Sequence, residues 1–138
     1  MGNVNKYLVF FLIVLVGVSA CVFGSSPSNN QLIIKLALIE KVQVSILESF
    51  PVQVHVRIQG ILDSSCTTLH QITQHREENI FFIEITTERP VDILCADVVT
   101  LFEENVALDV YGLPAGTYIV DVNGVRDGFT LDVDNVLP

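Results

Sequence analysis

Residues 50–59 read Phe-Pro-Val-Gln-Val-His-Val-Arg-Ile-Gln, a stretch in which apolar and polar side chains alternate one by one. A β-strand turns successive side chains to opposite faces, so this alternation predicts a strand with one face on a core and the other in water. Pro51 near its start indicates a strand entry or a sheet edge. The side chains expected to face inward are Phe50, Val52, Val54, Val56 and Ile58.

The same two-residue period recurs on both sides of this stretch. It predicts strands over residues 42–46, 81–86, 106–110, 118–122 and 129–133, with less regular ones over 67–75 and within 91–102, the last carrying Cys95. A bulge would reconcile Leu69 with Ile72 in the first irregular strand. Turns are expected at 77–79 and at Asn123-Gly124, which is the strongest short hairpin signal. Residues 103–105 would interrupt the chain between two strands. About seven short antiparallel strands predict an all-β fold, a β-sandwich or a barrel, and we favour the sandwich.

The N-terminal segment has the form of a secretory signal. Lys6 precedes an uninterrupted apolar run over residues 7–18, and small residues lead directly to Cys21. The arrangement resembles a bacterial lipoprotein signal, and this resemblance implies that Cys21 is lipidated and becomes the mature N-terminus. A retained transmembrane anchor is disfavoured, because residues 7–20 fall short of the roughly 20 that a spanning helix needs. Plain secretion is the remaining alternative.

These features divide the chain into three parts. Residues 1–20 would be the signal peptide, 21–38 the lipidated cysteine with a flexible tether rich in Gly, Ser, Pro and Asn, and 39–138 the sandwich domain. The pattern of residues 31–38 suits either a short helix or a strand edge. The protein would then be extracytoplasmic, anchored by lipid to the bacterial cell membrane or outer membrane.

The charge of the chain restricts its partners. The formal net charge is −9, and removal of residues 1–20 takes away one lysine and leaves −10. Nucleic acid is excluded as a partner on this ground, since its binding depends on Lys and Arg that neutralise phosphates. The acidic field also disfavours docking on anionic lipid surfaces.

Cys66 and Cys95 form an even pair in a compartment where disulfides persist, so we expect them to be bonded to each other. Metal ligation by these cysteines is the weaker reading. No Cys-x-x-Cys or His-x-x-x-His spacing is present, and His55, His70 and His75 are scattered among polar positions. We therefore expect no metal and no cofactor.

A local motif near the C-terminus sharpens the fold prediction. Residues 113–118 read Leu-Pro-Ala-Gly-Thr-Tyr, the Leu-x-x-Gly-x-Tyr form of a tyrosine corner built from Leu113, Gly116 and Tyr118. Here the chain resembles immunoglobulin-like and fibronectin type III-like β-sandwiches. Residues 112–124 and the Phe-Thr-Leu that follows resemble more closely the last part of the domain in a family of uncharacterised bacterial lipoproteins. This resemblance covers residues 42–133.

The chain departs from antibody domains at two points. Val120 stands where their second core cysteine would be, and the sequence contains no tryptophan. The expected disulfide must therefore join another pair of elements, and we place it near one end of the sandwich. A sandwich hosts many functions, so the fold does not decide the activity.

The sequence gives little support for a catalytic function. Adjacent Glu103 and Glu104 with Asp109 would supply paired carboxylates, but acid-base catalysis needs one of them in a dry cleft. No Gly-x-Ser-x-Gly elbow presents Ser64 or Ser65 as a nucleophile. A calcium site on the terminal hairpin is disfavoured because the spaced Asp-x-Asp-x-Asp-Gly loop is missing; its carboxylates would be Asp121, Asp127, Asp132 and Asp134. We expect a protein that is not an enzyme and has no catalytic residues.

Two function classes follow from this interpretation. The first is a binding module whose loops or exposed strand edge take a protein or glycan partner. A small protease inhibitor presenting the Cys66 end or the turn at residues 113–117 is a sharper form of it. The second is a structural or accessory protein of the envelope. Rigid loops with exposed apolar or aromatic residues, Tyr111 and Phe102 being the candidates, would favour binding.

Overall fold

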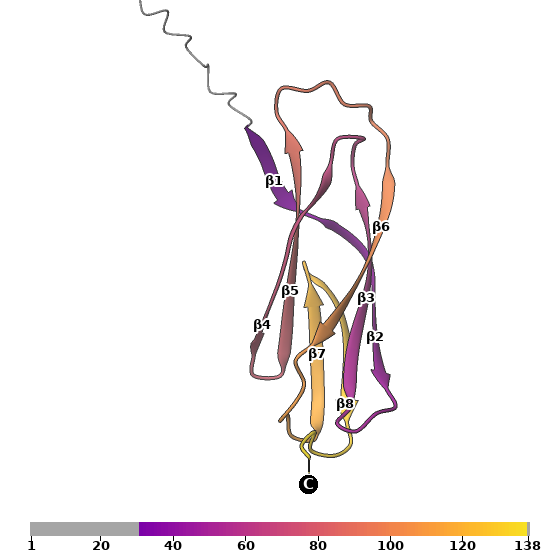
Figure 1. Ribbon diagram of the computed structural model, residues 1–138, viewed down its shortest axis with the longest axis vertical. Helices are drawn as coiled ribbons and strands as arrows, with labels where there is room; N and C mark the ends of the chain where they lie inside the picture. The colour runs from indigo at the N-terminus through magenta and orange to yellow at the C-terminus, as the bar shows by residue number, and fades with distance from the viewer. Residues whose placement is uncertain (1–30, 138) are drawn as a thin grey trace, which may run out of the picture.

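The computed structural model describes residues 31–137, which form eight β-strands and no helix (Figure 1). The signal peptide and the lipidation site expected at residues 1–20 and Cys21 lie outside the described residues. The strands are β1 (Leu32–Leu36), β2 (Leu38–Leu47), β3 (Gln53–Leu62), β4 (Thr68–Glu77), β5 (Ile80–Pro90), β6 (Thr100–Leu108), β7 (Gly116–Val122) and β8 (Val125–Leu131).

The strands form two sheets that pack as a β-sandwich, so the predicted fold class is confirmed, with eight strands where about seven were expected. One sheet has the order β1-β5-β7-β8, with β4 on the other edge of β5, and the second has the order β2-β3-β6. All pairs are antiparallel except β5 with β7, which run parallel over Ile80–Ile83 and Ile119–Val122. Alternation within single strands gives no information about the direction of their neighbours, which is why this parallel pair was not predicted.

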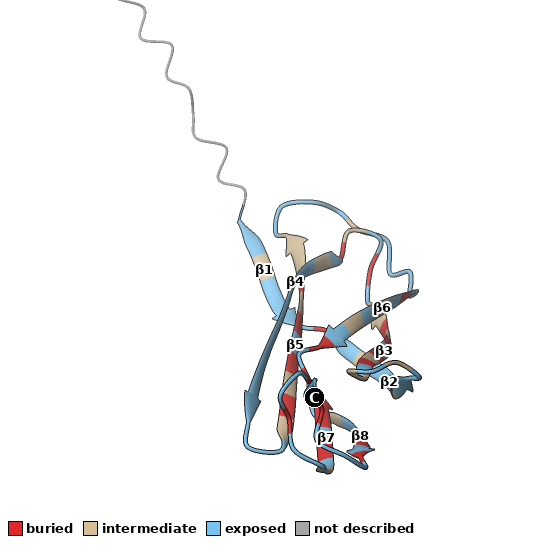
Figure 2. Cartoon of the chain, turned by 60° about the horizontal axis from the view of Figure 1, so that its bottom comes forward, coloured by how far each residue is buried: buried red, intermediate tan, exposed pale blue. Residues whose placement is uncertain are grey.

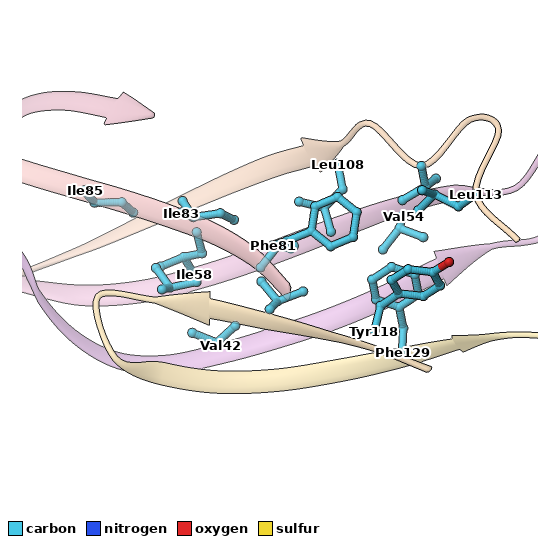
Figure 3. Close-up of a cluster of buried hydrophobic side chains, with 14 of the residues drawn as sticks. Val42, Val54, Ile58, Phe81, Ile83, Ile85, Leu108, Leu113, Tyr118 and Phe129 are labelled. Atoms are coloured by element: carbon cyan, nitrogen blue, oxygen red, sulfur yellow. The ribbon is translucent and has the colours of Figure 1, made fainter. Parts of the chain in front are cut away.

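The core lies between the two sheets and is supplied by every second residue of the central strands (Figure 2). Val54, Val56 and Ile58 of β3 are at most 1% exposed, as the opening stretch predicts. Figure 3 shows aromatic side chains at one end of this core and aliphatic ones at the other. The other fully buried apolar side chains of the core are Ile83, Ile85, Val120 and Val122. Phe50 is an exception to the predicted inward face, because it lies in the turn before β3 and is 58% exposed.

Two local turn predictions are confirmed by the backbone. The β4–β5 register shifts between Leu69 and Gln71, which is the expected bulge. Asn123 and Gly124 have φ values of 48° and 92° and connect β7 to β8 as a two-residue hairpin. Both positions therefore adopt the positive φ that a type I′ turn requires.

The segment 91–105 differs from its prediction. Residues 91–99 form no strand, and β6 begins at Thr100 and runs through the expected interruption at 103–105. The physical reason is pairing: Glu103, Glu104 and Asn105 are in register with β3, and the Glu103 carboxylate contacts Arg57. Solvent-facing polar side chains are compatible with a strand when a neighbouring strand provides their partners.

The folded domain also begins before residue 39, the boundary predicted from the sequence. β1 lies within the expected tether and pairs with the C-terminal end of β5. Of the two possibilities left open for residues 31–38, the structure therefore shows a strand. At Ala37 the chain crosses from the first sheet to the second, and its backbone N–H donates to Ile85. Ala37 is 5% exposed, so this crossing is part of the core.

Candidate binding surfaces

The loops at one end of the sandwich are joined by a disulfide between Cys66 and Cys95. Cys66 follows β3 and Cys95 lies in the β5–β6 connection, with their Cα atoms 5.6 Å apart. Beside the disulfide, Ser65 N–H donates to the Ala96 carbonyl and Ala96 N–H donates to the Ser65 hydroxyl, both at 3.0 Å. One covalent bond and two hydrogen bonds therefore hold the β5–β6 connection against the β3–β4 turn.

The β3–β4 turn is itself fixed by short polar contacts. The Thr67 hydroxyl donates to the Asp63 carboxylate at 2.7 Å and lies 2.7 Å from the Ser64 hydroxyl. Lys35 of β1 approaches the same carboxylate at 3.3 Å. The Thr67 hydrogen bond, followed by that from Lys35, holds the pKa of Asp63 below its ordinary value of 3.8. The turn is thus a stable base for the loop that the disulfide attaches to it.

The β5–β6 connection presents a row of bare aliphatic side chains. Leu94 is fully exposed, and its neighbours are between about half and three-quarters exposed. Figure 1 shows this connection arching over the end of the molecule where residue 31 enters, opposite the C-terminus. We call this surface the apolar tip; it consists of Ile93, Leu94, Val98 and Val99 of the connection and Leu101 at the start of β6.

The apolar tip is notable for what surrounds it as well as for its size. Monomeric soluble proteins seldom expose contiguous apolar side chains, and larger patches with a polar rim mark interaction sites. Asp92 and Asp97 are exposed residues of the same loop and flank these apolar side chains in sequence. Since the loop is clamped at Cys95 and Ala96, its apolar side chains are presented on a restrained backbone.

The second candidate surface is a hollow at the other end of the sandwich, between β4 and the β6–β7 loop. It is a cavity of about 390 Å³ bordered by Arg76, Phe81 and Tyr111. The Arg76 guanidinium lies 6.0 Å from the centre of the Phe81 ring and donates to the Glu78 carbonyl. The cavity is wide and mostly polar, so it offers less apolar area to a partner than the apolar tip.

The two aromatic residues proposed as binding anchors fall in different places. Tyr111 is 61% exposed beside this cavity, as a binding role requires. Phe102 is buried, which corrects the expectation that it is an exposed anchor. It stands opposite Gly60 in the β3–β6 register, and a Cβ on Gly60 would collide with its ring. The ring therefore fills the space that the glycine leaves.

The candidate catalytic side chains have ordinary structural partners. Hydrogen bonds from Arg57 and then Gln59 hold the pKa of Glu103 below its ordinary value of 4.5, the opposite of what a general acid requires. Ser64 contacts Thr67, and Ser65 contacts Ala96. His70 pairs with Glu88 at 2.7 Å, and the ring of His75 stacks on Phe82. Ser64, Ser65, His70 and His75 are thus each engaged with a different partner.

The four aspartates considered for calcium are dispersed. Asp121 accepts from the Gly124 N–H and pairs with Arg126, whereas Asp127 accepts from Val44 of β2 at 2.8 Å. Asp134 accepts from the Ala115 N–H, and Asp132 is exposed at the end of β8. Within residues 31–137 no group of three His, Cys, Asp or Glu side chains is placed to hold a metal ion.

Leu113 and Tyr118 of the tyrosine corner lie at the same end of the core as Phe129 (Figure 3). The Tyr118 hydroxyl donates to the Pro114 carbonyl at 2.8 Å, and its ring stacks on Phe129 with centres 5.3 Å apart. Leu113 is buried beside them and Gly116 opens β7. Because Leu113 is buried, the turn at residues 113–117 presents less apolar surface than an inhibitory loop would.

Two asparagines with structural roles were not identified from the sequence. The Asn123 side chain accepts from Ile85 N–H and donates to the carbonyls of Ile85 and Ala37, which fixes the crossing from β1 to β2. The Asn135 side chain bonds both backbone groups of Val52 and the Val110 carbonyl. The Asn-Gly turn signal pointed to Asn123 as a turn residue only, and Asn135 carries no signal of its own.

The fold and the matched segment decide the family. A family model described as the ORF11 beta-sandwich domain matches residues 56–131, from the middle of β3 to the end of β8. The chain belongs to the ORF11 beta-sandwich domain family. The matched segment includes both cysteines of the disulfide and the entire apolar tip.

Three proteins from Herpetosiphon aurantiacus are similar in sequence to this chain. The uncharacterized 10.2 kDa protein in the HgiCIIM 5′ region is 36% identical over 94 residues, which is 68% of this chain and 99% of the relative. Those in the HgiBIM and HgiEIM 5′ regions are each 37% identical over 83 residues, 60% of this chain and all of the relative. No solved structure matches the chain. In the described part of the chain, no helix is long and apolar enough to cross a bilayer.

Proposed function

We infer that this ORF11-family protein is a non-enzymatic binding module, held outside the cytoplasm by lipid on Cys21, that docks a protein partner with its apolar tip. The observation that carries this proposal is the fully exposed Leu94 on a loop clamped by the Cys66–Cys95 disulfide. A restrained loop loses little conformational entropy on binding, so its apolar area contributes more to affinity.

The composition of the apolar tip favours a protein partner over a lipid surface. Its centre is aliphatic, while Asp92 and Asp97 make the rim acidic. An acidic rim is repelled by anionic lipid but attracts a partner whose own patch is bordered by Lys or Arg. We therefore assign to the partner an apolar patch with a basic border.

The location of the apolar tip agrees with an anchor at the leading cysteine. The described chain enters at the end of the sandwich that carries the apolar tip (Figure 1). Residues 21–30 would separate the lipid from that end by at most about 35 Å, even if fully extended. A partner at the tip would then be another protein of the same envelope layer, close to the membrane surface.

Site-specific photo-crosslinking in the native envelope tests this function. A photoreactive phenylalanine analogue replaces Leu94 in the full chain, and the matched control carries it at Thr73, an exposed position of β4. The expected result is one discrete protein adduct from position 94, lost when Val99→Asp is added. Adducts with lipid alone, or equal adducts from both positions, would contradict a protein partner at the apolar tip.

The structural or accessory role is the alternative function. It would be favoured by a surface that is polar and acidic throughout, because such a surface offers no site for tight association. In the same experiment it predicts no protein adduct from position 94.

A further inference from the structure

β1 has an edge that no strand of the described chain covers. It pairs only with β5, at the end of the five-stranded sheet where residue 31 enters (Figure 1). Three observations show which of its backbone groups face away from β5. The Gln31 carbonyl accepts from Val91, the Ala37 N–H donates to Ile85, and Leu32 lies opposite Pro90, which has no N–H to give.

Hydrogen bonds in an antiparallel pair alternate along each strand. Because residues 31 and 37 bond toward β5, the odd-numbered residues of β1 carry that ladder. The N–H and C=O groups of Leu32, Ile34 and Leu36 therefore point to the open edge. The side chains of these residues are 46%, 53% and 58% exposed, so the open backbone edge and an apolar row belong to the same three residues.

On two other edge strands, β2 and β6, side chains cap backbone groups. On β2, the Val44 N–H is taken by the Asp127 carboxylate of β8. Between β4 and β6, the Gln74 amide donates to the Ala107 carbonyl. Side-chain caps and charges of this kind are how natural sheets prevent edge-to-edge association. β1 lacks acidic residues in a chain of net charge −9, and its one charge, Lys35, is paired with Asp63.

The sequence of β1, Leu-Ile-Ile-Lys-Leu, is nearly symmetric about Ile34. An antiparallel copy centred on that residue would place Ile34 opposite Ile34 and Leu32 opposite Leu36, with the outward amides of each copy facing the carbonyls of the other. We propose that two copies of this chain pair antiparallel through the open edge of β1, around a two-fold axis at Ile34, to form one continuous sheet.

The near-symmetry of β1 points to a second copy as the occupant, and the absence of acidic residues from β1 permits its approach. Two chains this acidic repel each other over most of their surfaces, and an acid-free, self-complementary strand is where close approach costs least. A five-residue strand buries less than the roughly 1,200 Å² of a stable interface, so the pair is transient. Copies held on one membrane would meet at a higher effective concentration, although the pairing does not require the anchor.

Disulfide trapping in the full chain tests the pairing. Ile34→Cys would place two thiols across the axis, where Cα atoms of a hydrogen-bonded antiparallel pair are about 5.5 Å apart, within disulfide range. Thr73→Cys, on the opposite edge of the same sheet, is the matched control and shares every other cysteine. We expect covalent dimer from Ile34→Cys and none above background from Thr73→Cys. Equal yields, or no dimer from either, would overturn the proposal.

A charge-swap experiment identifies the occupant as a second copy. Full-length Ile34→Lys and Ile34→Glu are each expected to sediment as monomers at concentrations where the wild-type chain shows dimer. An equimolar mixture should recover the dimer, because opposite charges then face each other at the axis. Recovery also shows that both variants are folded. A wild-type chain that stays monomeric at every concentration, or variants that dimerise separately as well as the wild type does, would refute pairing through β1.

Discussion

The buried side chain of Asn135 ties the C-terminal segment to one end of this sandwich. Asn135 is 1% exposed, and its amide satisfies three backbone groups on the segments before β3 and after β6. Buried backbone groups must be paired, and here a side chain from the C-terminal segment pairs them. The last residues of the described chain therefore close the core.

Asn135→Ala should reduce the free energy of unfolding by about 2–4 kcal/mol, because the Val52 N–H and the Val52 and Val110 carbonyls would lose their partner in a buried site. Equilibrium urea unfolding followed by circular dichroism measures the loss. Asn105→Ala is the matched control, since Asn105 is exposed on β6, and should change the unfolding free energy by less than about 0.5 kcal/mol. Equal effects of the two substitutions would show that the Asn135 bonds do not stabilise the fold.

Individual residues also show which features of burial could be predicted from the sequence alone. The inward positions of Val54, Val56 and Ile58 were predictable because burial selects apolar side chains at every second position of a central strand. The burial of Phe102 was not, because it depends on Gly60, which lies 42 positions earlier in the chain and opposite it only after β3 and β6 pair. Tyr111 and Phe102 look alike in sequence, and packing alone separates them.

At the level of elements, the sequence predicted the strands with a regular two-residue alternation, left β1 open and misplaced the start of β6. β1 is apolar at both odd and even positions, so its pattern cannot distinguish strand from helix. Pairing with β5, from Leu32 with Pro90 to Leu36 with Thr86, decides its state. Residues 91–99 are rich in Val, Ile and Leu and were predicted to include a strand. They form a loop instead, because the disulfide and the Ser65–Ala96 hydrogen bonds fix a different path.

The disulfide gives a prediction at this scale. Cys66 and Cys95 are 29 positions apart, and closing a loop of that length in the unfolded chain is worth roughly 3 kcal/mol in the chain-entropy model. The double variant Cys66→Ala with Cys95→Ala should lose about that amount of unfolding free energy in urea titrations. Amide hydrogen exchange should also accelerate in residues 91–99, where the clamp of the apolar tip would be weakened.

Reduction provides the control for this prediction. A thiol reductant should lower the stability of the wild-type chain toward that of the double variant and leave the double variant unchanged. If the reductant has no effect on the wild type, or shifts both proteins equally, then the bond between the two loops is not what stabilises them.

For the molecule as a whole, the question is how the apolar tip and the open edge of β1 remain compatible with a soluble domain. Both lie at the end where the chain enters, and the net charge of the chain is −9. Repulsion between acidic bodies limits non-specific association, so contact is expected at these two mainly apolar surfaces. An anchor at Cys21 would hold that same end close to the membrane.

The anchor leads to the last prediction. Mass spectrometry of the native protein should find Cys21 as the first residue and carrying acyl groups, because stable membrane attachment takes about two lipid signals and a multiply acylated cysteine supplies them. Cys21→Ala should move the protein out of the membrane fraction while its circular dichroism spectrum remains that of a β-protein, since the described domain begins ten residues later. Lys6→Arg, which keeps the charge of the signal and leaves Cys21 in place, is the matched control and should remain in the membrane fraction. An unmodified thiol at position 21, or a Cys21→Ala chain that stays membrane-bound, would contradict lipid attachment through Cys21. The proposals for the apolar tip and β1 would be unaffected, because each rests on its own geometry and has its own test.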